Sequence, residues 1–168
     1  MEPLPYLEGY GPEIQARVRE LLEAGRLGAY LRERYPEAHD VRTDKALAQA
    51  AQELKNRFLR SAPPLSQVRY DGKLRLLSHA LGMNTTYSRV QGQRLRASRE
   101  IRVATVFRDA PAAFLRMILV HELAHLRERE HDKAFYRLCT HMEPDYFQLE
   151  LDLRIYLTHL DEPGRAQG

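Results

Sequence analysis

One short stretch, His121-Glu122-Leu123-Ala124-His125, restricts the fold of this chain more than any other segment of the sequence. On a helix, two histidines four positions apart lie on the same side, with about 40° of rotation and one turn between them. Both imidazoles can then reach one metal ion, while a leucine stripe on the opposite side can pack on a sheet. The stripe consists of Leu115, Leu119, Leu123 and Leu126. The stretch therefore predicts a helix that packs on a sheet and turns its histidines toward a cleft.

Helical periodicity also marks the beginning of the chain. Apolar residues recur every three or four positions over residues 12–34, with interruptions expected at Gly25 and Gly28. A second helix is predicted over residues 43–59, and Ala62-Pro63-Pro64 follows its end. Candidates for its N-cap are Thr43 and Asp44.

The middle of the chain changes to the period of strands. Asp71-Gly72 stands between residues 67–70 and 73–77 and favours a hairpin, because a type I′ turn needs positive φ at both central residues. A second hairpin is predicted over residues 86–97. Apolar and polar residues then alternate over 101–107, which predicts a further strand.

The last third of the chain is predicted to be helical again. The helix with the two histidines is expected to begin at Asp109 as N-cap, with Pro111 in its first turn. Two more helices are predicted over residues 132–142 and 145–160. The expected fold class is α+β, with a small, mainly antiparallel sheet packed on the helix of the H-E-x-x-H stretch and with N-terminal and C-terminal helices. One domain is expected over residues 1–168, with a helical N-terminal segment (1–64), the sheet (65–107), the later helices (108–160) and a loose tail (161–168).

The residue types of the central stretch predict a metal centre with hydrolytic chemistry. His121 and His125 are candidate ligands, and Glu122 is the candidate general base because it lies beside the ligand positions without sharing them. A third ligand is expected, and His131 has the spacing of the pattern H-E-x-x-H-x-x-G-x-x-H, although Glu128 occupies the position of its glycine. Alternative third ligands are His141, Glu143, Asp145 and Glu150.

Composition narrows the cellular setting and the partners. The single cysteine, Cys139, fits a reducing cytoplasm and excludes a cysteine-based zinc knuckle. A net charge of +3 is compatible with a nucleic acid partner but does not require one. No apolar run approaches the length of a membrane span, so no membrane partner is expected.

With these residues in hand, the chain resembles the YgjP-like family of small bacterial zinc metallohydrolases. The segments that carry the resemblance include residues 101–107, 114–118, 121–126, 131–136 and 141–144. The family is similar to the SprT-like and WLM metallopeptidases, which implies a minimal zincin-like core and a cytoplasmic bacterial protein. The resemblance also implies that His121, His125 and His131 bind zinc, or another divalent metal, and that Glu122 is the general base.

Three functional hypotheses follow. The first is a zinc-dependent hydrolase of metallopeptidase type that acts on peptides or proteins. The second is a metal-dependent nucleotide pyrophosphatase that hydrolyses UTP to UMP and diphosphate, an activity to which the most similar subgroup of the family has been linked. The third is a non-catalytic, zinc-containing binding module. Candidate substrate contacts are Arg89, Arg94 and Tyr136, and candidates for stabilising an oxyanion are Tyr136, Tyr146 and Arg154.

Overall fold

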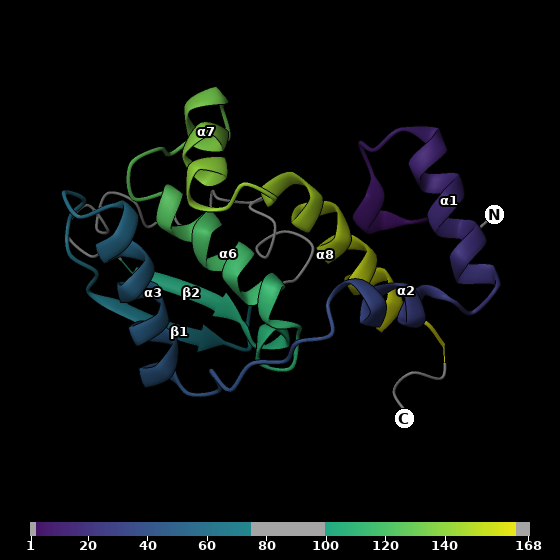
Figure 1. Ribbon diagram of the computed structural model, residues 1–168, viewed down its shortest axis with the longest axis horizontal. Helices are drawn as coiled ribbons and strands as arrows, with labels where there is room; N and C mark the ends of the chain where they lie inside the picture. The colour runs from purple at the N-terminus through teal and green to yellow at the C-terminus, as the bar shows by residue number, and fades with distance from the viewer. Residues whose placement is uncertain (1–2, 75–99, 164–168) are drawn as a thin grey trace.

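The computed structural model describes residues 3–74 and 100–163, and its elements follow the predicted order of helices, small sheet and helices (Figure 1). The 3-10 helix η1 (Pro5–Leu7), α1 (Pro12–Glu23), α2 (Leu27–Arg34) and α3 (Asp44–Phe58) precede the strands β1 (Gln67–Asp71) and β2 (Glu100–Ala104). The chain continues through the 3-10 helix η3 (Thr105–Arg108), α6 (Ala112–Ala124), α7 (Lys133–Met142) and α8 (Tyr146–Leu160). The α+β fold class is confirmed.

The two described strands are parallel, with Val68 opposite Ile101 and Tyr70 opposite Val103. The prediction of a mainly antiparallel sheet was therefore wrong for this pair. It relied on a type I′ turn at Asp71-Gly72, but Asp71 ends β1 and neither of these residues has a positive φ. Parallel strands need a crossover connection of a dozen or more residues, and residues 72–99 separate β1 from β2. Residues 75–97 of the two predicted hairpins lie outside the described residues.

Helix α6 lies at the centre of the described region of the molecule. It contacts α3, α7, α8 and β2, and α3 also packs against β1 (Figure 1). Its residues are apolar around most of the circumference, and Phe114, Met117, Val120 and Leu123 are fully buried. A helix with this composition is stable only when neighbours cover it on several sides. This burial holds the first histidine of the H-E-x-x-H stretch rigidly within the core.

Several predicted boundaries are confirmed and others need correction. The predicted helix over 12–34 divides at Gly25, whose φ of 67° lies in the left-handed region. Gly28 does not interrupt a helix: it lies inside α2, where an added Cβ would come within 2.9 Å of the His159 ring. Thr43 caps α3 as predicted, because its hydroxyl accepts a hydrogen bond from the Ala46 amide at 3.1 Å.

The segment between β2 and α6 differs from the prediction. The strand ends at Ala104, and residues 105–108 form η3. Asp109 does not cap α6; its carboxylate lies 2.7 Å from the Arg42 guanidinium, and Pro111 occupies the N-cap position. The local pattern favoured a cap, but an ion pair with a residue distant in sequence uses this carboxylate instead.

A buried carboxylate ties the N-terminal helices to the end of the chain. Asp152 on α8 is fully buried and accepts hydrogen bonds from the hydroxyls of Tyr30, at 2.9 Å, and Tyr35. The Gln148 amide donates a third hydrogen bond at 3.1 Å, and the Arg34 guanidinium lies 3.6 Å away. Because every donor points at one carboxylate, this group fixes α2 against α8.

Replacement of Asp152 by Ala is expected to lower the free energy of unfolding by about 3 kcal/mol, because it leaves the half-buried hydroxyls of Tyr30 and Tyr35 without their acceptor. Urea denaturation followed by circular dichroism measures this change. Asp145→Ala is the control, since Asp145 is exposed at the start of the same helix and makes no side-chain cap. Equal stability of the two variants would show that the carboxylate does not hold the helices together.

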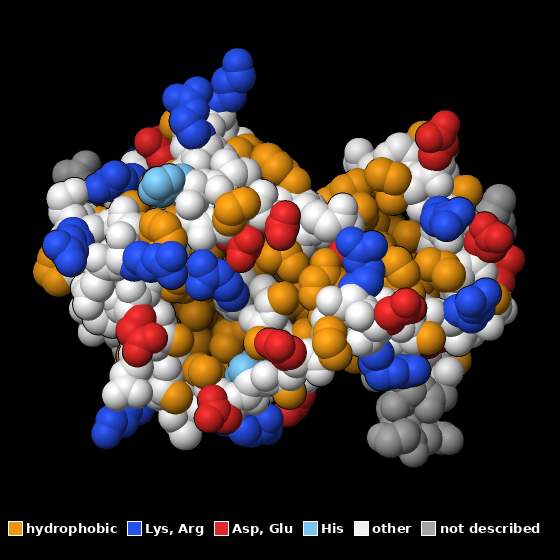
Figure 2. All heavy atoms as spheres, in the orientation of Figure 1, with side chains coloured by type: hydrophobic (Ala, Val, Ile, Leu, Met, Phe, Trp, Pro, Cys, Tyr) orange, Lys and Arg blue, Asp and Glu red, His pale blue; other side chains and the backbone are white. Residues whose placement is uncertain are grey.

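Charge on the visible surface is mixed rather than gathered in one patch. Figure 2 shows acidic and basic side chains interspersed over this face, with hydrophobic side chains in the hollow between α1 and the larger portion of the molecule. This face therefore does not show the continuous basic surface that is typical of proteins that bind nucleic acid strongly.

Candidate metal centre

His121 lies near the end of α6 and is almost completely buried. Its Nδ1 atom lies 2.7 Å from the hydroxyl oxygen of Tyr146, while its buried Nε2 atom has no hydrogen-bond partner among the described residues. A buried nitrogen without a partner is costly in a protein core unless a ligand satisfies it. Nε2 is therefore the atom that this residue offers to a cation.

His125 follows the last residue of α6 and is held by the backbone beyond it. Its Nδ1 atom lies 2.9 Å from the carbonyl oxygen of Glu128. The helix closes with hydrogen bonds from the Leu126 amide to the Leu123 carbonyl and from the Glu128 amide to the Ala124 carbonyl, both 3.0 Å. No non-glycine residue described has a positive φ, so this turn needs no glycine. The residue at the position of the expected glycine instead supplies the carbonyl that orients His125.

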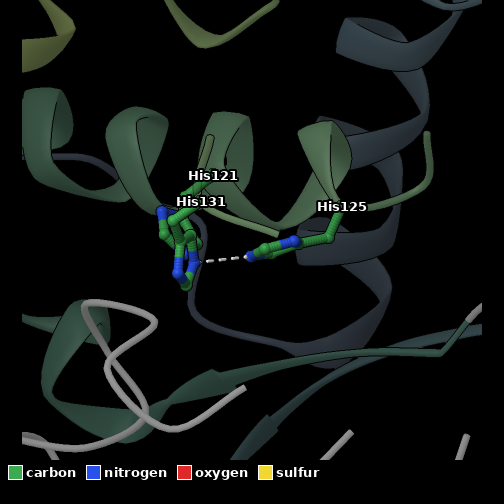
Figure 3. A group of neighbouring side chains, drawn as sticks. All are labelled: His121, His125 and His131. Atoms are coloured by element: carbon green, nitrogen blue, oxygen red, sulfur yellow. Dashed lines mark hydrogen bonds between the residues drawn. The ribbon is translucent and has the colours of Figure 1, made fainter. Parts of the chain in front are cut away.

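His131 lies in the loop before α7, and its ring lies beside those of His121 and His125. Its Nε2 atom is 3.0 Å from Nε2 of His125. One ring nitrogen from each of His121, His125 and His131 can be chosen so that all three lie within 4.8 Å of one another (Figure 3). Nitrogens bound to a tetrahedral zinc ion at about 2.0–2.1 Å are roughly 3.3 Å apart. The three imidazoles therefore fit a zinc-sized ion with little rearrangement.

Phe135 forms the apolar wall of this centre. Its ring centroid lies 5.0 Å from that of His121, 4.5 Å from that of His125 and 4.9 Å from that of His131. The side chain is fully buried, so it excludes water from one side of all three imidazoles. Burial, together with the neighbouring His125 and His131, holds the pKa of His121 well below its usual range. His121 is thus neutral at pH 7, which is the form that binds metals.

Glu122 is adjacent to the three histidines in sequence but is not a member of the ligand group. It retains partial solvent exposure, and burial of its carboxyl group raises the pKa of Glu122 to about 8. A carboxyl group with a pKa near the working pH is suited to proton transfer. The role of Glu122 as general base stays a prediction.

The alternative third ligands do not join this group. Glu143 pairs with the Arg116 guanidinium at 3.0 Å, and the His141 ring packs on Phe58. Asp145 precedes α8 and is exposed. Glu150 is outside the group, and its Oε1 atom lies 3.7 Å from Nη2 of Arg154. Among the described residues, His131 is the third member of the group, as the spacing predicted.

The predicted substrate contacts have different outcomes. The Tyr136 ring centroid lies 6.5 Å from that of His131, so this side chain borders the centre. Arg89 and Arg94 lie outside the described residues. Of the two other oxyanion candidates, Tyr146 is engaged with His121, and Arg154 is buried with its Nη1 atom 2.7 Å from the Tyr6 carbonyl oxygen. Sequence reasoning did not find the contact of Tyr146 with His121, or the wall made by Phe135.

Comparison with known proteins agrees with this geometry. The model of the YgjP-like, metallopeptidase domain matches residues 32–156. The chain is 59% identical over 160 residues to a UTP pyrophosphatase of Escherichia coli (strain K12), with 95% of this chain and 96% of that protein covered. No solved structure matches. No helix within residues 3–74 and 100–163 is long and apolar enough to cross a membrane.

These matches set aside the hypothesis of a non-catalytic binding module, because the family consists of enzymes. The motif, the three converging imidazoles and the match over most of the chain all agree. The chain belongs to the YgjP-like family of metal-dependent hydrolases.

Proposed function

We propose that this enzyme hydrolyses UTP to UMP and diphosphate at a zinc ion held by His121, His125 and His131. The observation that carries the proposal is the convergence of the three imidazoles beside Glu122, in a chain 59% identical to a UTP pyrophosphatase. Three imidazole ligands favour zinc over magnesium, which prefers oxygen. Such an ion supplies a Lewis acid that makes water a better nucleophile at neutral pH.

Residues of the chain transfer the proton and exclude water from the centre. The carboxylate of Glu122 accepts a proton from the water that attacks the α-phosphorus. The bond from this phosphorus to the bridging oxygen of the leaving diphosphate breaks, and the proton passes from Glu122 toward the departing oxygen. Phe135 excludes water from one side of the centre, so the charges at the reacting atoms are poorly screened there.

Parallel assays with a panel of nucleoside triphosphates and a peptide library test this function. We expect UMP and diphosphate to form from UTP, turnover to stop when a chelator removes the metal, and one equivalent of zinc to restore it. Turnover of UTP that persists after complete removal of zinc would contradict the metal-centred mechanism.

A second candidate function is peptide hydrolysis, since the matching family model describes a metallopeptidase domain and H-E-x-x-H is the motif of zinc metalloproteases. Glu122 would then pass the proton to a leaving amine. Cleavage of peptides without hydrolysis of any nucleotide in the same assays would favour this function.

The surface next to His131 offers a place for the base of the nucleotide. Phe147 is 56% exposed, and its ring centroid lies 5.3 Å from that of Tyr136, which borders His131. Stacking of a base on an aromatic ring contributes about 1–3 kcal/mol. We therefore propose that Tyr136 and Phe147 contact the uracil base.

Phe147→Ala is expected to raise KM for UTP about 10-fold with little change in kcat, because the stacking contact is lost and the reacting groups stay in place. Steady-state kinetics measures both constants. Ile14→Ala is the matched control, since Ile14 is the other exposed large hydrophobic residue among those described. Equal KM values for the two variants would place the base elsewhere.

A further inference from the structure

We propose that Tyr146 and Glu150 are positioning residues that orient His121 and strengthen its binding to the metal, although neither touches the ion. The inference rests on the metal centre of the proposed function, but it does not depend on which substrate is hydrolysed.

The first step is the contact between Tyr146 and His121. Tyr146 is the first residue of α8 and is fully buried, and its hydroxyl lies 2.7 Å from Nδ1 of His121. A neutral imidazole that offers Nε2 to a metal carries its proton on Nδ1. The Tyr146 oxygen therefore accepts this hydrogen bond, which fixes both the tautomer and the angle of the ring.

The second step is the fate of the phenolic proton. Because its oxygen accepts from His121, the Tyr146 hydroxyl can donate its own proton to another group. Glu150 lies one helical turn further along α8 on the same face, and the two side chains are close enough for each to shift the pKa of the other. The Cys139 thiol also contacts the hydroxyl, but sulfur is a weak acceptor beside a carboxylate. The proposed hydrogen bonds run from His121 through Tyr146 to Glu150, and we call these three residues the histidine relay.

The third step is the anchoring of the carboxylate. Arg154 lies one turn beyond Glu150, and its Nη2 atom is 3.7 Å from Oε1 of Glu150. The Arg154 guanidinium is itself fixed by the carbonyl oxygen of Tyr6. Residues 146, 150 and 154 share one face of α8, so a single helix holds the whole arrangement behind the histidine.

This arrangement has a chemical consequence for the metal centre. Groups that accept the second N–H of a ligating histidine orient the ring and make it more basic, and their loss lowers metal affinity by about 10- to 100-fold. Here the group in contact is a neutral phenol, and the negative charge stands one step behind it. Both the hydroxyl of Tyr146 and the charge of Glu150 therefore contribute.

Competition with a chromogenic chelator measures the zinc affinity of the whole chain and tests the proposal. We expect Tyr146→Phe to bind zinc about 10- to 100-fold more weakly than the wild type. Glu150→Gln, which keeps an acceptor but removes the charge, is expected to show a smaller loss in the same direction. Tyr70→Phe is the matched control: Tyr70 is buried and its hydroxyl donates to the Val41 carbonyl at 2.5 Å. It should lose stability and keep wild-type zinc affinity.

A second measurement separates positioning from a merely structural role. In the zinc-loaded protein, the Nδ1 proton of His121 is expected to give a downfield NMR signal that Tyr146→Phe shifts or removes and Tyr70→Phe leaves in place. Wild-type zinc affinity in both Tyr146→Phe and Glu150→Gln would overturn the proposal. Should Tyr146→Phe not fold, unchanged affinity in Glu150→Gln alone would overturn it.

The outcomes for the histidine relay and for the proposed function are distinguishable. Weaker zinc binding by Tyr146→Phe supports the relay even if UTP proves not to be the substrate. A wild type that binds no zinc would overturn both the relay and the metal centre.

Discussion

Glu122→Gln is expected to lower kcat for UTP by about 10²- to 10⁴-fold, the usual contribution of a general base, while zinc stays bound at the wild-type stoichiometry. The amide has nearly the same shape as the carboxyl group but does not accept the proton of the attacking water. Because Glu122 is outside the group of converging nitrogens, its substitution leaves the three imidazoles intact. Diphosphate release and metal content, measured on the same sample, check both halves of this expectation.

Glu128→Gln is the matched control for this variant. Glu128 lies near the same histidines, but it is its backbone carbonyl that contacts His125, and the substitution leaves this carbonyl in place. The control should therefore retain wild-type turnover. A Glu122→Gln variant that hydrolyses UTP as fast as Glu128→Gln would remove Glu122 from the reaction.

His131→Ala is expected to weaken zinc binding by more than about 100-fold and to reduce UTP turnover in proportion. This loss is larger than the one expected for a residue that contacts a ligating histidine but not the metal itself. Two imidazoles from one helix end would remain, and they do not complete the three-ligand set of a catalytic zinc site. Metal content after dialysis and competition with a chelator measure the loss.

His141→Ala is the control for the third ligand. His141 lies on α7, the helix that follows His131, but it is exposed and packs on Phe58 instead of on the centre. Equal zinc affinity in the His131 and His141 variants would show that another group completes the coordination.

Much of the metal centre could be predicted from the sequence because its geometry is local. The spacing of His121 and His125 requires a helix, and the short segment from His125 to His131 is enough for one turn of chain. The absence of a glycine at position 128 did not indicate the position of His131 correctly. The turn forms with ordinary backbone angles, and the carbonyl of Glu128 contacts His125. A backbone carbonyl is present in every residue, so no sequence pattern marks this contact.

The contacts that could not be predicted join residues far apart in the chain. Tyr146 reaches His121 across 25 positions, and Tyr35 reaches Asp152 across 117. Periodicity describes which face of an element is apolar, but it does not say which partner that face meets. The parallel pairing of β1 and β2 was missed for the same reason. The Asp71-Gly72 pair is a strong local hairpin pattern, but β1 pairs with β2, which begins only at residue 100.

The contacts of α8 also bear on the order in which the protein folds during its synthesis. Tyr6, Tyr30 and Tyr35 leave the ribosome early, but their partners Arg154 and Asp152 belong to the last helix described. The segments η1 and α2 therefore keep an exposed apolar face until α8 has been translated. Contacts of such long sequence separation slow folding and prolong the exposure of surfaces that aggregate. Nascent chains that stall before residue 152 are the species that we expect to depend most on chaperones.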